Sequence, residues 1–206
     1  TITVSNSPAG TVTPSGIVNT VYGENRTITV QADPDAHIAD IKVDGAAAGV
    51  FTSDSNLCTV AFTAIAADHT LYARFNRKPV ADVAVSPATG SVPARIMFDF
   101  SDSTDSDGSI IRCEIDKDGD GIFESSADGL GQVEVEYGAP GTYHPVVRVI
   151  DNDCGYGVAT AGVVQIFGAG PVADLQAAPA SGQAPLAVTL DGTASHAGVG
   201  YRIEVY

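Results

Sequence analysis

The chain has 206 residues, of which 25 are Asp or Glu and only 10 are Lys or Arg, so its formal net charge is −15. This charge argues against nucleic acids and anionic membranes as partners, because both are bound through clustered basic side chains. Hydrophobic residues make up 44% of the chain, which is typical of a folded protein rather than a disordered acidic tail. No apolar run approaches the roughly 20 residues that a membrane-spanning helix needs.

Short runs in which apolar and polar residues alternate recur along the chain, separated by Gly, Pro and Asp. Such alternation is typical of strands with one buried face, and no long window shows helical spacing. The clearest runs are residues 27–30, 41–43, 132–135 and 146–150. The sequence therefore predicts an all-β chain built from sandwiches or barrels.

Residues 1–76 contain three short motifs that belong together. They are a G-x-V-x-P-x-G start at 10–16, IADIKVDG at 38–45 and DHTLYARF at 68–75. With these motifs the segment resembles a divergent internalin-type B-repeat of bacterial surface proteins. The resemblance implies a small β-rich module that serves as a spacer or adhesive unit. We expect residues 76–78 to link it to the next module.

The chain contains an internal repeat. PVADVAVSPATGSVP at 79–93 returns as PVADLQAAPASGQAP at 171–185, and a strand is expected after each, at 94–98 and 186–190. Further on, Arg112 and Glu114 match Arg202 and Glu204. The first copy reaches 167, before the linker 168–170, whereas the second stops about halfway. Half a sandwich cannot bury its own face, so we expect a further strand, from this protein or from a partner, to complete it.

Residues 79–167 resemble a PKD domain, the module named after the polycystic kidney disease protein. The matching elements after the opening motif are STDSDGSI at 103–110, DKDGDGIFE at 116–124, the run at 137–155 and a closing VVQIF at 163–167. The resemblance implies an immunoglobulin-like β-sandwich in a secreted or cell-surface protein, with residues 171–206 as a partial second copy. Many such domains carry a Trp where this chain has Cys113, Glu114 and Ile115.

Tyr143 stands directly before the strand expected at 146–150. A Tyr at this place in a sandwich often ties its hydroxyl to backbone at the corner. We expect Val147 and Val149 to pack in the core and Arg148 to face solvent.

Four aspartates flank two loops that meet at one end of such a sandwich. Asp105 and Asp107 precede the strand at 110–115, and Asp151 and Asp153 follow the strand ending at 150. Some PKD relatives bind calcium through these loops, and the resemblance carries that role to Asp105, Asp107 and Asp151, with Asp153 and Asp102 as weaker candidates. Calcium takes about 6 to 8 oxygen ligands. The alternative is a set of solvated turns in which Asp accepts backbone N–H groups.

A second candidate calcium site follows at Asp116, Asp118 and Asp120. These residues match the first, third and fifth positions of an EF-hand loop, with Gly121 sixth and Glu124 ninth. The match fails at the twelfth position, where Ala127 stands in place of a bidentate Glu. The alternative is a plain acidic hairpin turn.

The three cysteines fit no zinc motif. Cys113 and Cys154 border strands expected to be neighbours, so a disulfide between them is a hypothesis. Cys58 is expected to be a small buried apolar residue.

The four histidines are scattered, and no nucleophile motif or phosphate-binding loop is evident. We therefore expect no enzyme. The main hypothesis is a structural or interaction module array, in its stronger form a subunit of an extracellular fibre that assembles through residues 171–206. The alternative is a set of accessory modules of a secreted hydrolase that bind polysaccharide or matrix protein. The chain has no Trp and seven Tyr, and carbohydrate platforms usually need exposed aromatic side chains.

Overall fold

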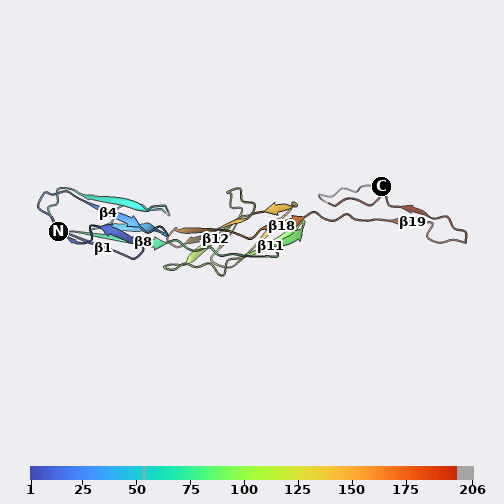
Figure 1. Cartoon of the computed structure of the whole chain (residues 1–206), viewed down its shortest axis with the longest axis horizontal. Helices are drawn as coiled ribbons and strands as arrows, with labels where there is room; N and C mark the ends of the chain where they lie inside the picture. Colours follow the sequence, from blue (N-terminus) through green and yellow to red (C-terminus); the bar gives the residue numbers. More distant parts are fainter. Residues whose placement is uncertain (53, 199–206) are drawn as a thin grey trace.

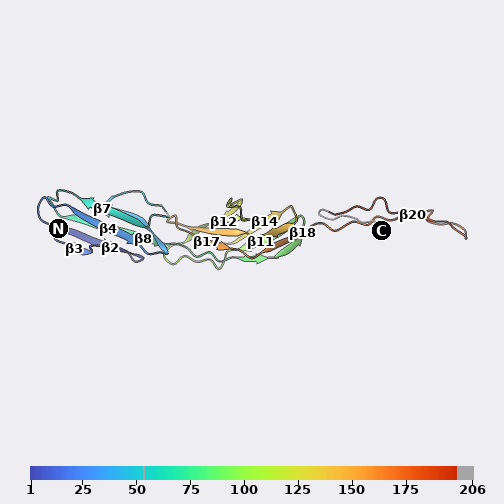
Figure 2. The same cartoon turned by 45° about the horizontal axis from the view of Figure 1, so that its top comes forward.

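A computed structural model describes residues 1–52 and 54–198, and all regular elements of this part are β-strands, as predicted. Figures 1 and 2 show a long molecule in which two sandwiches follow one another and residues 171–198 extend beyond them. No helix within the described ranges is long and apolar enough to cross a membrane.

The first sandwich, which we call the N-terminal sandwich, consists of two facing sheets. One has the order β3-β1-β8-β5-β6 and the other β2-β4-β7. All neighbouring strands are antiparallel except β1 and β8, which are parallel. The strands are β1 (Ile2–Asn6), β2 (Gly10–Thr13), β3 (Gly16–Val18), β4 (Arg26–Ala32), β5 (Ala36–Val43), β6 (Ala46–Ala47), β7 (Leu57–Phe62) and β8 (His69–Arg77).

The core of this sandwich is formed by apolar residues that alternate with polar residues along the strands. In β4, Ile28 and Val30 are fully buried while Thr27 and Gln31 face solvent. Ile38, Ile41 and Leu71 from the other sheet meet them in one hydrophobic cluster. The strands predicted at 27–30 and 41–43 are therefore confirmed.

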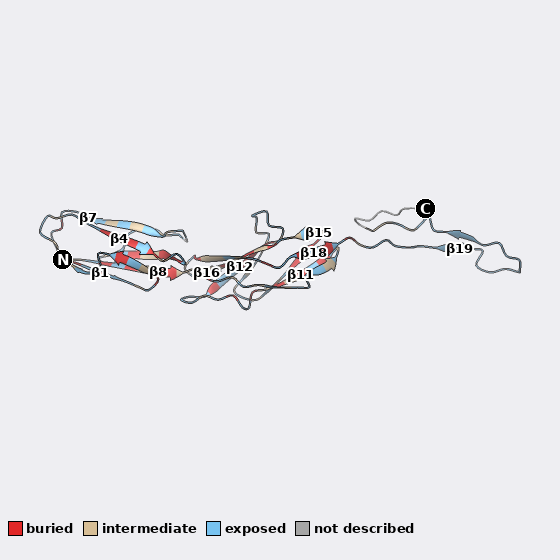
Figure 3. Ribbon diagram, viewed as in Figure 1, coloured by how far each residue is buried: buried red, intermediate tan, exposed pale blue. Residues whose placement is uncertain are grey.

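The second sandwich, the central sandwich, has an immunoglobulin-like architecture. Its sheets have the orders β13-β12-β16-β17, β14-β11-β9 and β10-β18-β15. Figure 3 shows the buried residues concentrated inside the two sandwiches. The strands are β9 (Ala84–Ser86), β10 (Thr89–Ser91), β11 (Ala94–Asp99), β12 (Ile110–Asp116), β13 (Ser125–Asp128), β14 (Gln132–Tyr137), β15 (Gly141–Tyr143), β16 (Val146–Asp151), β17 (Tyr156–Thr160) and β18 (Val164–Phe167).

The expected sandwich corner is present at Tyr143. Its hydroxyl donates a hydrogen bond of 2.9 Å to the carbonyl oxygen of Ala139, four residues upstream. In the following strand, Val147 and Val149 are fully buried. Arg148 lies on the opposite face, where its Nε donates a 2.8 Å hydrogen bond to Glu114.

Residues 171–198 repeat the start of the central sandwich residue for residue. β19 (Gln176–Ala178) pairs with β20 (Thr189–Asp191), and Ala177 faces Leu190 as Val85 faces Phe98. The backbone N–H of Asp174 donates to Ser195 Oγ at 2.9 Å, as that of Asp82 does to Ser103 Oγ. The sequence repeat is thus also a repeat of strand register.

The two copies differ in what covers them. Phe98 is fully buried, but its counterpart Leu190 is 63% exposed and Val188 is 46% exposed. β11 gains a long antiparallel partner in β14, and nothing in the described part of the chain plays that role for β20. This explains why β20 covers only the end of the strand predicted at 186–190. The match of Arg202 and Glu204 falls outside the described residues.

The predicted disulfide is wrong, because all three cysteines are free. Cys113 is opposite Val149 in the β12–β16 register, while Asp151 is already opposite Ile110. Cys154 lies beyond that level, so at about 3.3 Å per residue it is too distant from Cys113 for a bridge. Burial raises the pKa of the Cys113 thiol to about 11. Cys58 is only partly buried.

Candidate functional site

The end of the central sandwich that carries Asp105, Asp107, Asp151 and Asp153 contacts the end of the N-terminal sandwich. The two predicted loops do meet there, as expected. Their partners, however, are side chains and backbone groups of β5 and β8. We call this contact the junction.

Asp153 makes the most direct ion pair of the junction. Arg74 Nη1 and Nη2 donate to its two carboxylate oxygens at 2.7 and 2.8 Å. Bidentate pairs of this kind fix orientation as well as adding energy. The hydrogen bond from Arg74 holds the pKa of Asp153 below its usual value. His37, which is buried on β5, places its Nε2 3.1 Å from the Asp153 carbonyl oxygen.

Asp151 is fully buried and organises its own loop. One carboxylate oxygen accepts the backbone N–H groups of Asp153 and Gly155, both at 2.8 Å. The other accepts a 2.8 Å hydrogen bond from the side-chain amide of Asn76, across the junction. Since buried polar groups are costly unless paired, Asn76 and Asp151 stabilise each other only while the sandwiches are docked.

Asp107 and Asp105 lie beside this pair. Asp107 accepts the backbone N–H of Arg77 at 3.0 Å. Asp105 Oδ2 is buried and has no hydrogen-bond partner among the described residues. Burial, followed by the charges of Asp151 and Asp107, raises the pKa of Asp105. An unpaired buried carboxylate oxygen near two other negative charges fits a cation chemically. Among the described residues, however, Asp105, Asp107 and Asp151 do not bring their oxygens within 4.8 Å of one another, and Arg74 already occupies both oxygens of Asp153.

The connecting segment is also held against the central sandwich. A side chain at Gly157 would overlap the carbonyl of Pro79, so the connection passes directly over β17. Lys78 Nζ lies 5.8 Å from the centre of the Tyr156 ring, within the range of a cation–π contact. The predicted link at 76–78 is therefore partly strand, because β8 continues to Arg77.

A cleft of about 450 Å³ opens beside the ion pair, between the two sandwiches. The N-terminal sandwich contributes a turn at 7–9 and the outward side of β8, and the central sandwich contributes its acidic loops. The polar and aromatic residues that line it include Ser7, Tyr72, Arg74, Arg77, Ser106, Asp107 and Asp153.

The second predicted site forms a compact acidic loop. Asp116 accepts backbone N–H groups from Gly119, Asp120 and Gly121 at 2.7 to 3.2 Å. Gly121 has φ +93°, a conformation that favours glycine and suits the sixth position of an EF-hand-like turn. Oxygens of Asp116, Asp118, Asp120 and Glu124 lie within 4.8 Å of one another. This donor set fits a hard cation, and its acidic side chains other than Asp116 are exposed.

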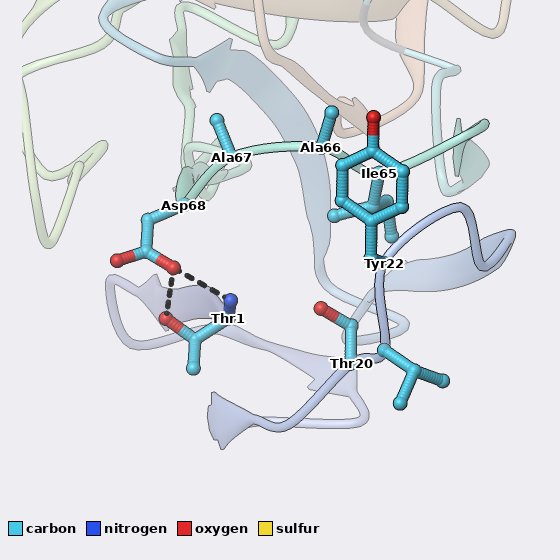
Figure 4. A pocket seen from close by; sticks show the side chains of 8 residues that line it. Thr1, Thr20, Tyr22, Ile65, Ala66, Ala67 and Asp68 are labelled. Carbon is cyan, nitrogen blue, oxygen red and sulfur yellow. Dashed lines mark hydrogen bonds and ion pairs between the residues drawn. The ribbon is translucent and has the colours of Figure 1, made fainter.

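A smaller hollow lies at the opposite end of the N-terminal sandwich (Figure 4). It has a volume of about 360 Å³ and is lined by Tyr22, Ile65 and Asp68 among others. Tyr22 is 88% exposed, and its loop is fixed by a 2.8 Å hydrogen bond from the Gly23 N–H to the Ile65 carbonyl. The hollow is distant from the junction and provides a control position.

Arg74, Asn76 and His37 were not predicted from the sequence as functional residues. Arg74 and Arg77 at the end of one module, before an acidic module, were an available signal of charge complementarity. Nothing local in the sequence indicates which carboxylate each would meet, because that depends on how the two sandwiches dock.

No known protein family matches this sequence, and no curated protein matches it.

Three solved structures are similar to parts of this chain. Carbohydrate-binding modules of the β-sandwich superfamily are 20% identical over 52% of this chain and 50% of theirs, with a TM-score of 0.39. Fibronectin(III)-like modules of Clostridium thermocellum CbhA are 13% identical over 71% and 87%, with a TM-score of 0.41. A β-glycosidase from Bacteroides vulgatus is 9% identical over 77% and 25%, with a TM-score of 0.25. The chain thus spans half the length of the first and a quarter of the third, and the likeness concerns fold alone.

Proposed function

We propose that this chain is a non-catalytic, extracellular or cell-surface array of β-sandwich modules that acts as a stiff spacer. The observation that carries the proposal is the junction, where Arg74, Asn76 and Arg77 hold three carboxylates of the central sandwich. Modules joined only by a linker would move independently. Within this proposal, residues 1–76, 79–167 and 171–206 are a B-repeat-like module, a PKD-type module and a partial second PKD-type copy.

Small-angle X-ray scattering tests the stiffness. The chain should give a scattering curve that one arrangement of the first two sandwiches explains, and an Arg74→Ala, Asn76→Ala double variant should require a broad ensemble. Arg95→Ala is the matched control, because Arg95 pairs with Glu134 at 2.8 Å on an exposed face away from the junction. A wild-type chain that already requires a broad ensemble would refute the spacer function.

We also propose that the array assembles through residues 171–198, with a second copy of the chain as the occupant. The support is the edge of β20 that pairs with no other strand of the described residues, together with the exposed Val188 and Leu190. Unpaired edges beside apolar side chains readily pair with another strand. Two copies can pair the same edge about a twofold axis, which is the commonest symmetry of protein dimers.

We propose that calcium binds at two sites. The acidic loop offers Asp116, Asp118, Asp120 and Glu124, and the junction offers Asp105 with Asp107 and Asp151. The support is the clustering of oxygens in the first and the unpaired Oδ2 of Asp105 in the second. A bound calcium ion would neutralise carboxylate repulsion and make each loop more rigid.

A second function, polysaccharide binding by accessory modules of a secreted hydrolase, is favoured by one observation. This is the cleft at the junction, which combines a half-exposed aromatic ring with hydroxyl, guanidinium and carboxylate groups. A pull-down on insoluble polysaccharide tests this function independently of the spacer function.

A further inference from the structure

The cleft at the junction has the dimensions of a ligand site. Its volume of about 450 Å³ lies within the range of about 300 to 1,000 Å³ that is usual for small-molecule pockets, and such pockets form preferentially between domains. One wall is the outward side of β8 with the turn at 7–9, and the other consists of the loops that carry Ser106, Asp107 and Asp153.

Both walls are ordered before any ligand arrives. Ser7 accepts the backbone N–H of Phe75 at 2.9 Å through its hydroxyl, and its own N–H donates to the Ala73 carbonyl at 3.0 Å. The opposite wall is fixed by the ion pair between Arg74 and Asp153. A preformed cleft binds with a smaller entropic cost than one that must be assembled.

The charges that line the cleft balance. The charges of Arg74 and Asp153 cancel in their ion pair. The other two charged lining residues, Arg77 and Asp107, carry one formal charge of each sign, and the Arg77 guanidinium is also paired with Asp35. This neutrality is local, because the whole chain has a net charge of −15. Paired donors and acceptors of this kind suit an uncharged ligand with many hydroxyl groups.

Tyr72 supplies an apolar surface at the rim. Its side chain is on the outward side of β8, 40% exposed, between Ser5 of β1 and Lys42 of β5 in the strand register. An aromatic ring with a polar tip at a wet rim packs against apolar CH groups while its hydroxyl stays hydrated. A sugar ring presents CH groups on one face and hydroxyl groups around its edge.

We propose that this cleft binds one or two sugar residues of a neutral polysaccharide. The ring of Tyr72 packs on a sugar face, and Ser7, Ser106 and the exposed edges of the Arg74–Asp153 pair bind the hydroxyl groups. The inference rests on the second candidate function, polysaccharide binding, and assigns its site. Because the two walls belong to different sandwiches, an occupied cleft would also hold the sandwiches together.

Affinity gel electrophoresis of the full chain tests the proposal with cellulose derivatives, mixed-linkage β-glucan, xylan and starch as neutral probes, and with polygalacturonate as a charged probe. At least one neutral probe should retard the wild-type chain. Tyr72→Ala should weaken this association about tenfold or more, as is common for an aromatic anchor, and Tyr72→Phe should retain most of it. Tyr22→Ala, at the distant hollow, should bind as wild type.

The outcomes separate the site from the function. Retardation that Tyr72→Ala leaves unchanged, or that Tyr22→Ala abolishes, overturns this site but leaves polysaccharide binding standing. If no neutral probe retards the wild-type chain, both the site and the binding function are overturned. The spacer function is tested separately, by small-angle X-ray scattering. Thermal melts of each variant confirm that its fold is retained.

Discussion

Arg74 on β8 and Asp153, after β16, form a two-pronged ion pair that joins sandwiches from distant parts of the chain, with N–O distances of 2.7 and 2.8 Å. The loop of Asp153 was predicted to bind calcium, and the structure shows that a guanidinium occupies this particular carboxylate. Positive charge is thus supplied to the acidic loops by the neighbouring sandwich.

Removing this ion pair should loosen the junction. We expect Arg74→Met or Asp153→Asn to lower the free energy of unfolding by about 1 kcal/mol, since both side chains are partly exposed and solvent screens the pair. A double-mutant cycle by urea unfolding measures the coupling. A coupling indistinguishable from zero would show that the pair is incidental.

The same pair predicts a dependence on pH. The pKa of Asp153 is lowered in the folded state, so its stabilising contribution is present above the ordinary pKa of an aspartate and is lost as the pH falls through the lowered value. Wild type should therefore lose more stability on acidification than Asp153→Asn. Equal losses would contradict this assignment.

Asp105 should behave in the opposite way. Its pKa is raised in the folded state, chiefly by burial, so its favourable contribution exists at low pH and disappears as the pH rises through the raised value. Asp105→Asn should accordingly stabilise the calcium-free chain at pH 7 and have little effect in strong acid. Thermal melts across this pH range provide the measurement, and destabilisation at pH 7 would rule out an unfavourable buried charge.

The acidic loop depends on Asp116 for its shape. Asp116→Ala removes the acceptor of three backbone N–H groups, and we expect a loss of about 1 to 3 kcal/mol in unfolding free energy. Asp118→Asn, at an exposed position, is the control and should change stability little without calcium. Similar losses from both variants would contradict the structural role of Asp116.

Calcium should raise the melting temperature if either proposed place binds it. At a free concentration 100 times the dissociation constant, a folded-state ligand adds about 2.7 kcal/mol of stability. Melts in calcium and then in chelator measure the effect, and Asp118→Asn with Asp120→Asn, compared with Asp105→Asn, shows which place is responsible. Identical wild-type melts would end the calcium proposal.

Assembly through residues 171–198 should depend on Leu190. Sedimentation or light scattering should detect a concentration-dependent dimer of the full chain, and Leu190→Asp should shift it to monomer because a charge then occupies the apolar face. Leu130→Asp is a control at a half-exposed position of the central sandwich. A wild-type chain that stays monomeric at all concentrations would refute the second copy as occupant.

Much of the fold could be predicted because its determinants are local. Alternation located β4, β14 and β16, the repeat predicted a strand at 186–190 whose end is β20, and the position of Tyr143 predicted the sandwich corner. The Cys113–Cys154 bridge failed because strand register, which sequence neighbourhood does not reveal, separates the two thiols. The partners of Asp151 and Asp153 could not be predicted, since they depend on the docking of two independently built cores.

Gly157 has a consequence for engineering. The Pro79 carbonyl oxygen lies where a Cβ atom of residue 157 would be. The connecting segment can therefore follow its path only because residue 157 has no side chain. If the central sandwich is fused to a different preceding module, it will keep its present angle to that module only if the new linker follows the same path over β17. Because Gly157 belongs to the central sandwich, the angle between the two sandwiches is set partly by the sequence of the central sandwich.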